Sequence, residues 1–262
     1  MINNNSIGVY DSGVGGLTVF KELVDILPNE KYIYFGDLKN LPYGEKTKEE
    51  LIIIGKKIFD FFLKKNVKAV VMACNTTSAM IYDEFKDKYP FKIYTVIQTV
   101  AKALANQDIE KLGIFATEAT INSHAYKKEI LKYKNIEIFE QACPKWVRIV
   151  ENKDFSKENI EIVKNDLEKM SKNNPQKIVL GCTHYPYLTD ILSKYVSKDI
   201  FINPARIFAQ LIADDMKNNK LISNENKFEE NFYVSKNPEQ FMESSKMFYP
   251  VKIKPHIENM HK

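Results

Sequence analysis

Residues 7–36, IGVYDSGVGGLTVFKELVDILPNEKYIYFG, contain the pattern that decides the fold. IGVYD and KYIYFG are short runs rich in β-branched and aromatic residues, which favour strands. Between them, LTVFKELVDILP places apolar residues on one helical face: Leu17, Phe20, Val24 and Leu27. Pro28 then stops the helix. A strand, a helix and a strand in this order predict a parallel βαβ unit.

The same alternation continues along the chain. A helix is expected in TKEELIIIGKKIFDFFLKKN, where Thr47 and Glu50 form a capping box, and a strand is expected in VKAVVMA. After KIYTVI the pattern restarts with KLGIFATEATINSHAYKKEIL and IEIFEQ, a helix over residues 156–172, KIVLG, a helix from about Tyr187, and DIFIN. FEENFYV, NPEQFMESSKMF and VKIKPHI then read as a strand, a helix and a strand.

These elements predict an α/β protein with two pseudo-symmetric parallel-sheet domains and an active site at their interface. Residues 1–97 and 208–262 are expected to form the first domain, and residues 98–207 the second. LGIFATEAT resembles IGVYDSGVG, and IVLGCTHYPY resembles VVMACNTTSA, which suggests an old duplication.

Composition excludes several classes of protein. A chain of 262 residues with 44% hydrophobic residues is not disordered, and its formal charge of +4 comes from lysines interleaved with acids rather than from a nucleic-acid-binding patch.

With no leader-like N-terminus and no apolar run long enough to cross a bilayer, a cytoplasmic protein without a membrane partner is expected. Three widely separated cysteines predict reduced thiols.

Polar clusters follow the predicted strands, and in open parallel sheets ligands bind beyond the carboxyl ends of the strands. DSGVGG lacks both the G-x-G-x-x-G spacing and the lysine of a phosphate-binding loop, so its glycines indicate a tight turn and close approach of a small ligand. Asp11 and Ser12 suit an ammonium and a carboxylate group, respectively, although either residue is also a common helix N-cap.

Two cysteines occupy equivalent places, where a strand ends and a helix is expected to begin. A lone cysteine is usually a small buried hydrophobe, but Cys74 and Cys182 lie where helix amides lower a thiol's pKa. Each precedes side chains that can hold an anion: Asn75 and Thr76, and Thr183 and His184. Cys143 lacks such neighbours and is expected to pack in the core.

The ligand set for zinc is incomplete, so no metal is expected. A Cys–His amidase or protease with Cys74 or Cys182 as its nucleophile remains an alternative, but it leaves the matching thiol without a role. Inversion of an α-carbon needs a base on one face and an acid on the other, and two facing thiols can exchange these roles.

With these residues assembled, the sequence resembles the glutamate racemases of the aspartate/glutamate racemase family, bacterial isomerases that supply D-glutamate for peptidoglycan. The resemblance rests on IGVYDSGVGGLTV, YFGD with PYG, ACNT, ATEATINSHAY, ACP, Val150-Glu151 and LGCTHYP, in order over most of the chain. It implies two α/β domains around glutamate, no cofactor, a homodimer, and a role in cell-wall biogenesis and cell shape.

The resemblance also implies roles for individual residues. Cys74 takes the proton from D-glutamate and Cys182 from L-glutamate, while Asp11, Glu151 and His184 assist the thiols. Substrate contacts are implied for Asp11, Ser12, Tyr43, Gly44, Asn75, Thr76, Thr183 and His184, with Thr117 and Thr120 in a second tier. Arg148 stands where these enzymes commonly have a proline, close to a crossing between the domains.

Two further interpretations stay open at this point. One is a related enzyme of the same fold that performs decarboxylation or hydrolysis, although single-thiol chemistry needs only one of the two cysteine motifs. The other is a two-lobed binding protein that holds glutamate without turning it over.

Overall fold

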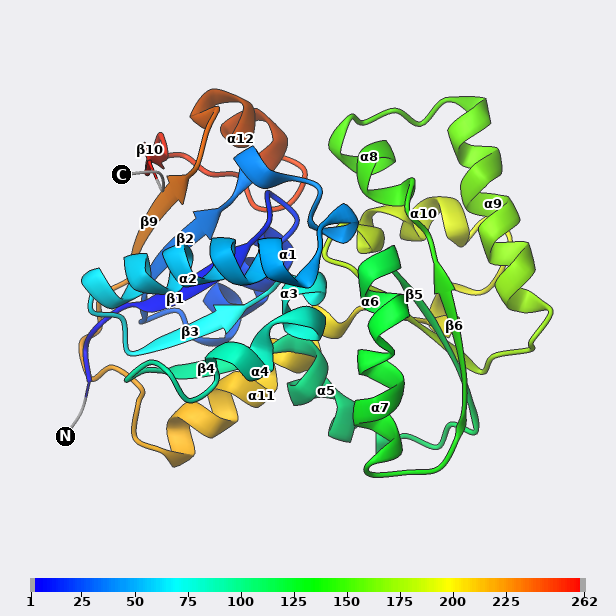
Figure 1. The fold of residues 1–262 in the computed structure, drawn as a ribbon, viewed down its shortest axis with the longest axis horizontal. Coiled ribbons are helices and arrows are strands. Elements are labelled where there is room, and N and C mark those ends of the chain that lie inside the picture. Colours follow the sequence, from blue (N-terminus) through cyan, green and yellow to red (C-terminus); the bar gives the residue numbers. More distant parts are fainter. Residues whose placement is uncertain (1–2, 260–262) are drawn as a thin grey trace.

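The strands form two parallel sheets that lie side by side (Figure 1) in a computed structural model that describes residues 3–259. The six-stranded sheet has the order β10-β9-β2-β1-β3-β4 and the four-stranded sheet the order β6-β5-β7-β8. The six strands are β1 (Ile7–Asp11), β2 (Lys31–Gly36), β3 (Ala69–Met72), β4 (Lys92–Thr95), β9 (Glu229–Val234) and β10 (His256–Ile257). The other four are β5 (Lys111–Ala116), β6 (Glu137–Ala142), β7 (Lys177–Gly181) and β8 (Phe201–Ile202).

The two sheets repeat one topology, because β2-β1-β3-β4 in the first recurs as β6-β5-β7-β8 in the second. We call each sheet with the helices packed on it a lobe. We call the two inner strands of this repeated four-strand unit, β1 and β3 or β5 and β7, its central strands; their carboxyl ends lie next to each other. This arrangement confirms the predicted fold class of two pseudo-symmetric parallel α/β units.

Helices cover the sheets. In the first lobe they include α1 (Leu17–Ile26), α2 (Lys48–Lys64), α3 (Asn75–Met80), α4 (Tyr82–Phe85), α5 (Val96–Ala105), α11 (Pro204–Asn218) and α12 (Pro238–Ser245). In the second they include α6 (Glu118–Ser123), α7 (Ala125–Leu131), α8 (Trp146–Glu151), α9 (Lys157–Ser171) and α10 (Thr189–Leu192). Short 3₁₀ turns complete the chain: η1 (Leu38–Asn40), η2 (Tyr43–Glu45), η3 (Tyr185–Leu188) and η4 (Lys198–Ile200).

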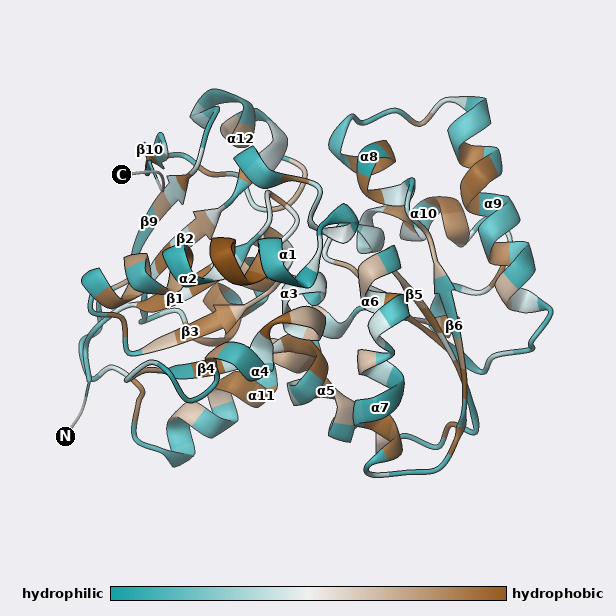
Figure 2. Cartoon of the chain, in the orientation of Figure 1, coloured by the Kyte–Doolittle hydropathy of each residue, from teal (hydrophilic) through white to brown (hydrophobic). Residues whose placement is uncertain are grey.

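Strand β1 shows why both faces of the sheet are buried. Ile7 and Val9 pack into a core with α1 and α11, whereas Tyr10 packs into a second core with α2. Helices on both faces remove every residue of the strand from water, as is usual for parallel sheets. Figure 2 shows the resulting pattern, with mostly hydrophobic strands and with helices such as α9 that alternate hydrophobic and hydrophilic residues.

Helices α5 and α11 join the lobes. They pack against each other, α5 also packs against α7, and their buried apolar residues belong to a core that continues into the second sheet. The predicted domain boundaries after residues 97 and 207 fall inside these two helices. Those boundaries stay a prediction.

Local predictions were mostly accurate, with some differences. The capping box of Thr47 and Glu50 is present at the start of α2. The helix expected from about Tyr187 is instead the 3₁₀ turn η3 followed by the short α10, and the strand expected in VKIKPHI is confined to β10. Within residues 3–259, no helix is both long enough and apolar enough to cross a membrane.

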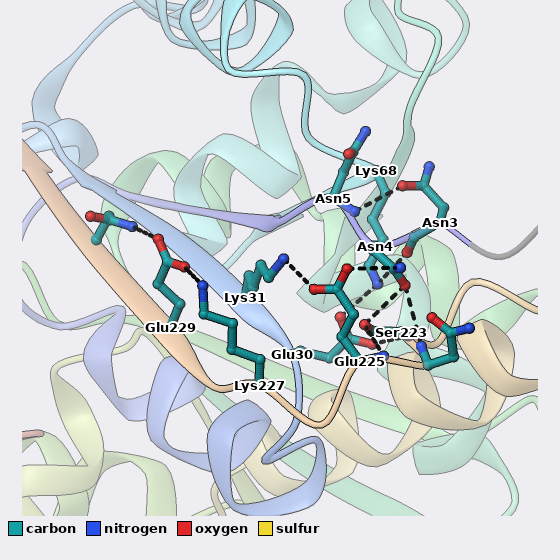
Figure 3. A network of polar contacts seen from close by, with 12 residues as sticks. Asn3, Asn4, Asn5, Glu30, Lys31, Lys68, Ser223, Glu225, Lys227 and Glu229 are labelled. Atoms are coloured by element: carbon teal, nitrogen blue, oxygen red, sulfur yellow. Dashed lines mark hydrogen bonds and ion pairs between the residues drawn. The ribbon is translucent and has the colours of Figure 1, made fainter.

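A buried ion pair fastens the edge of the first lobe away from the cleft (Figure 3). The Nζ of Lys68 lies 2.6 Å from Oε2 of Glu30, and these side chains are 0% and 2% exposed. Lys68 also donates to the carbonyl of Asn3, and Oε1 of Glu30 accepts from the backbone N–H of Ser223. The pair thus ties together the segments that precede β1, β2, β3 and β9.

We expect Lys68→Met to lower the free energy of unfolding by about 3–5 kcal/mol, because it leaves the Glu30 carboxylate buried without its cation. Urea denaturation would measure the change. Lys31→Met is the matched control, because Lys31 pairs with Glu225 in a more exposed position and its loss should change stability much less. Equal losses in the two variants would contradict a special role for the buried pair.

Candidate active site

A cavity lies between the lobes, where the carboxyl ends of the central strands meet. Its volume is about 40 Å³, room for only a few water molecules. Most of the sequence-predicted site residues line it: Ser12, Tyr43, Gly44, Cys74, Asn75, Thr76, Thr117, Cys182, Thr183 and His184. The other predicted residues stand behind these and contact them: Asp11, Thr120 and Glu151.

The two thiols enter the cavity from equivalent places in the two lobes. Cys74 follows β3 and is the N-cap residue of α3, whereas Cys182 directly follows β7. Both are buried, and both are free. Cys143 is also free but fully buried away from the cavity, where its Sγ lies 3.8 Å from the carbonyl oxygen of Gln141.

The environment of Cys74 reverses one expectation from the sequence. Burial and, to a smaller extent, the nearby Asp11 carboxylate raise the pKa of the Cys74 thiol to about 12, although hydrogen bonds from Thr77 act in the opposite direction. The backbone N–H of Thr77 in α3 lowers this pKa, as expected, but the net shift is upward, against the expectation. Removal of the thiol from water outweighs the amides of a six-residue helix.

Cys182 has a different neighbourhood. Its Sγ lies 3.7 Å from Nδ1 of His184, and Nε2 of His184 lies 2.5 Å from Oε1 of Glu151, which α8 supplies. Burial alone would lower the pKa of His184, but the hydrogen bonds to Cys182 and Glu151 raise it well above the usual value. Cys182 therefore faces an imidazolium that a carboxylate holds in place.

Asp11 lies at the end of β1 and is completely buried. Its Oδ2 accepts from the backbone N–H of Gly13 at 3.0 Å, and its Oδ1 accepts from the Thr183 hydroxyl at 3.5 Å. Burial raises the pKa of Asp11 to about 6, and the nearby His184 counteracts part of this rise. The carboxyl group therefore changes charge just below neutral pH.

The segment DSGVGG brings the lobes into contact. A Cβ on Gly15 would lie 2.5 Å from Oγ1 of Thr183 and 2.6 Å from Cε1 of His184, so only glycine permits this approach. Helix α1 begins after Gly16, and neither Asp11 nor Ser12 is its N-cap residue. The structure therefore excludes the N-capping alternative for these two side chains.

Hydrogen bonds cross the cleft beside the thiols. Oγ1 of Thr76 lies 2.9 Å from Oγ1 of Thr117, and the Tyr126 hydroxyl donates to Oδ1 of Asn75 at 2.6 Å. Thr117 also lies 2.9 Å from Oγ1 of Thr120, which explains how Thr120 contacts the site without lining it. These bonds link the two lobes beside the cavity.

At the rim of the cavity, Nη2 of Arg148 lies 2.6 Å from Oε1 of Glu45. This ion pair joins α8 of the second lobe to η2 of the first. Glu45 was not predicted as the partner of Arg148. Several lining residues were also not predicted as site residues: Leu41, Pro42, Glu45, Glu118, Pro144 and Val147. Pro42, Glu118 and Pro144 lie within the motifs PYG, ATEATINSHAY and ACP, and Glu45 follows PYG, which was the available signal for them.

Among residues 3–259, no group of three or more histidine, cysteine, aspartate or glutamate side chains is placed to hold a metal ion. The hydroxyl and amide groups of the cavity wall instead provide hydrogen-bond partners for a small polar molecule.

Residues 7–212 match the Asp/Glu/Hydantoin racemase family. The chain is 41% identical to a glutamate racemase of Carboxydothermus hydrogenoformans over 231 residues, which cover 87% of this chain and 86% of that protein. The crystal structure of a Francisella tularensis glutamate racemase in complex with D-glutamate has a TM-score of 0.90 and 32% identity, with 98% of each chain covered. A Thermus thermophilus glutamate racemase in complex with β-chloro-D-alanine has a TM-score of 0.85 and 29% identity, over 98% of this chain and 96% of that one.

The contact between His184 and Glu151 generates a prediction about pH. Glu151→Gln should lower the pKa of His184, because the imidazolium loses its carboxylate partner. NMR titration of the histidine ring would measure this shift. Glu140→Gln, beside His124, is the control and should leave His184 unchanged.

The same raised pKa fixes the direction of a stability change. Protonated His184 stabilises the folded protein below about pH 6.5, and this contribution is lost as the pH rises through the folded-state pKa. In Glu151→Gln this contribution should therefore be smaller, and its loss should be complete at a lower pH. An unchanged His184 titration in this variant would contradict the assignment.

Proposed function

Because the chain belongs to the Asp/Glu/hydantoin racemase family, we propose that it is a glutamate racemase that interconverts L-glutamate and D-glutamate by proton transfer at the α-carbon. Cys74 and Cys182 act as the two acid/base groups. The observation that carries the proposal is the pair of buried thiols that enter one cavity from equivalent strand ends of the two lobes. Such a pair can reach opposite faces of one carbon.

The reaction proceeds as an exchange of two protons. From L-glutamate, a thiolate at Cys182 takes the α-proton, and the electron pair of the broken C–H bond stays on the substrate. The Cys74 thiol then donates its proton to the opposite face, which forms D-glutamate and leaves a thiolate at Cys74. The raised pKa of Cys74 suits this acid role, because the group is a protonated thiol near neutral pH.

The neighbours of the thiols assist in different ways. His184, held by Glu151, offers a positive hydrogen-bond partner to the sulfur of Cys182 when that sulfur is negative. Asp11 carries a charge that compensates the substrate ammonium group, and its pKa of about 6 lets it exchange a proton during the cycle. The two thiols therefore have different charged neighbours, His184 beside Cys182 and Asp11 near Cys74.

The remaining predicted residues hold the substrate. Hydroxyl, amide and backbone donors of the cavity wall suit the two carboxylates of glutamate: Ser12, Tyr43, Gly44, Asn75, Thr76, Thr117 and Thr183. Thr120 acts through its hydrogen bond with Thr117. Glutamate would occupy the cavity between the lobes, whose lining supplies most of these groups. Binding then replaces some of the hydrogen bonds that cross the cleft.

The broader biological assignment follows from the family resemblance. The enzyme works without a cofactor or metal, as a cytoplasmic homodimer, and supplies D-glutamate for peptidoglycan biosynthesis. Residues 1–97 with 208–262 and residues 98–207 act as the two domains that carry Cys74 and Cys182, respectively.

Replacement of either Cys74 or Cys182 by serine should lower racemisation at least about a thousandfold, because a hydroxyl is a poor base near neutral pH. Cys143→Ser is the matched control and should retain most activity, because its thiol lies outside the cavity. The two losses should not add in the double variant, since the thiols act as one unit. Circular dichroism or a coupled assay for D-glutamate would measure turnover.

In deuterated water, early deuterium should appear mainly in the enantiomer that is being formed. Equal early labelling of recovered substrate, or near-normal turnover in Cys74→Ser or Cys182→Ser, would overturn the two-base assignment.

Glutamate should be preferred over aspartate by about a hundredfold or more in kcat/KM. Fixed polar partners at both ends of the site leave buried groups unpaired when the shorter amino acid binds. Steady-state kinetics with both amino acids would test this preference. Comparable kcat/KM values would count against glutamate as the substrate.

A further inference from the structure

We propose that Tyr126 is a positioning residue, which fixes the side-chain amide of Asn75 so that its N–H groups, and not its oxygen, face the substrate. Tyr126 is the second residue of α7 in the second lobe, and Asn75 is the first residue of α3 in the first lobe. The inference rests on the proposed function, because it gives Asn75 a carboxylate of glutamate as its ligand. Tyr126 itself does not line the cavity that contains the two thiols.

The oxygen of the Asn75 amide is committed to Tyr126. Its Oδ1 accepts from the Tyr126 hydroxyl at 2.6 Å, and the two residues are 3% and 1% exposed. Burial raises the pKa of the Tyr126 hydroxyl, and the negative charge of Cys182 acts in the same direction. The hydroxyl therefore keeps its proton at physiological pH and remains a donor.

The nitrogen of the same amide is free to bind a ligand. Within residues 3–259, Nδ2 of Asn75 has no hydrogen-bond partner, and it is not sealed from solvent. The open space beside Asn75 comprises the cavity of the two thiols and a cavity of about 10 Å³, which has room for at most about one water molecule. A carboxylate can therefore reach Nδ2 only from the cavity of the thiols.

The chemistry of that cavity favours this orientation of the amide. The opposite orientation would turn Oδ1 towards a space that contains a thiolate and, under the proposed function, receives two carboxylates. Negative and partially negative atoms would then face each other where water screens them little. With Oδ1 held by Tyr126, the two N–H groups of the amide face the anions instead.

The ring of Tyr126 is held in place independently of its hydroxyl. A Cβ on Gly181 would lie 3.1 Å from Cε2 of the ring, so the ring packs against the end of β7, directly before Cys182. The ring also belongs to the hydrophobic core. Phenylalanine at this position should keep the packing and remove only the hydroxyl.

Tyr126→Phe should weaken glutamate binding about tenfold, because the freed amide can turn its oxygen towards the carboxylate. Isothermal titration with racemic glutamate would give the dissociation constant, since racemisation does not change the composition of a racemate. Tyr32→Phe is the matched control. It removes a fully buried hydroxyl that donates to the carbonyls of Leu23 and Leu27, and it should leave the dissociation constant unchanged.

A double-variant cycle separates positioning from a general loosening of the lobes. In an Asn75→Ala background, Tyr126→Phe should weaken binding by less than about twofold, because the side chain through which Tyr126 acts is already absent. NMR gives a direct signature. The side-chain amide signals of Asn75, identified by their absence from Asn75→Ala, should shift in Tyr126→Phe and stay in place in Tyr32→Phe.

Asn75→Asp provides a test that does not depend on the folding of Tyr126→Phe. Its carboxylate still accepts from the Tyr126 hydroxyl, but it offers the ligand a negative charge in place of two donors. Glutamate should therefore bind at least about tenfold more weakly than to the wild type.

Four results would overturn the positioning role: unchanged affinity in Tyr126→Phe, an equal loss in Tyr32→Phe, a full further loss in the Asn75→Ala background, or wild-type affinity in Asn75→Asp. Failure of the proposed function looks different. A wild-type protein that binds glutamate without racemising it would overturn that function, while the affinities of the variants still decide the role of Tyr126. A wild-type protein that does not bind glutamate would overturn both.

Discussion

The removal of ionisable groups from water is the constraint on which the site depends. Cys74, Asp11 and His184 are all buried, and in this setting each responds mainly to its few neighbours. Burial keeps Cys74 protonated and shifts Asp11 towards neutral pH, whereas Glu151 and Cys182 keep His184 charged. Two similar cysteine segments thus acquire different chemistry from the side chains around them.

Repeated topology explains how these groups meet. In each lobe the central strands end at the cleft, so that β1 and β3 deliver Asp11 and Cys74 while β7 delivers Cys182. Parallel strands place all their carboxyl ends on one side, and two such sheets facing each other enclose a site that neither could form alone. Gly15 permits the final close approach between the lobes.

Features that depend on neighbouring residues in the chain could be predicted from the sequence, whereas features that depend on tertiary packing could not. The capping box depends only on Thr47 and Glu50, which are three residues apart, and the positions of the cysteines depend on where strands end. Both could therefore be predicted from the sequence. The 3₁₀ turn after Cys182, the role of α11 as a bridge between lobes, and the partner of Arg148 depend on contacts distant in sequence. The predicted direction of the Cys74 pKa shift was wrong because a helix terminus is visible in a sequence, whereas the extent to which a thiol is removed from water is not.

The hydrogen bonds across the cleft also bear on exchange with solvent. Under the proposed function, an amino acid that binds the side chain of Thr76 or Thr117 competes with the bond between them. Stronger bonds across the cleft would exclude water better, but they would also oppose the release of product.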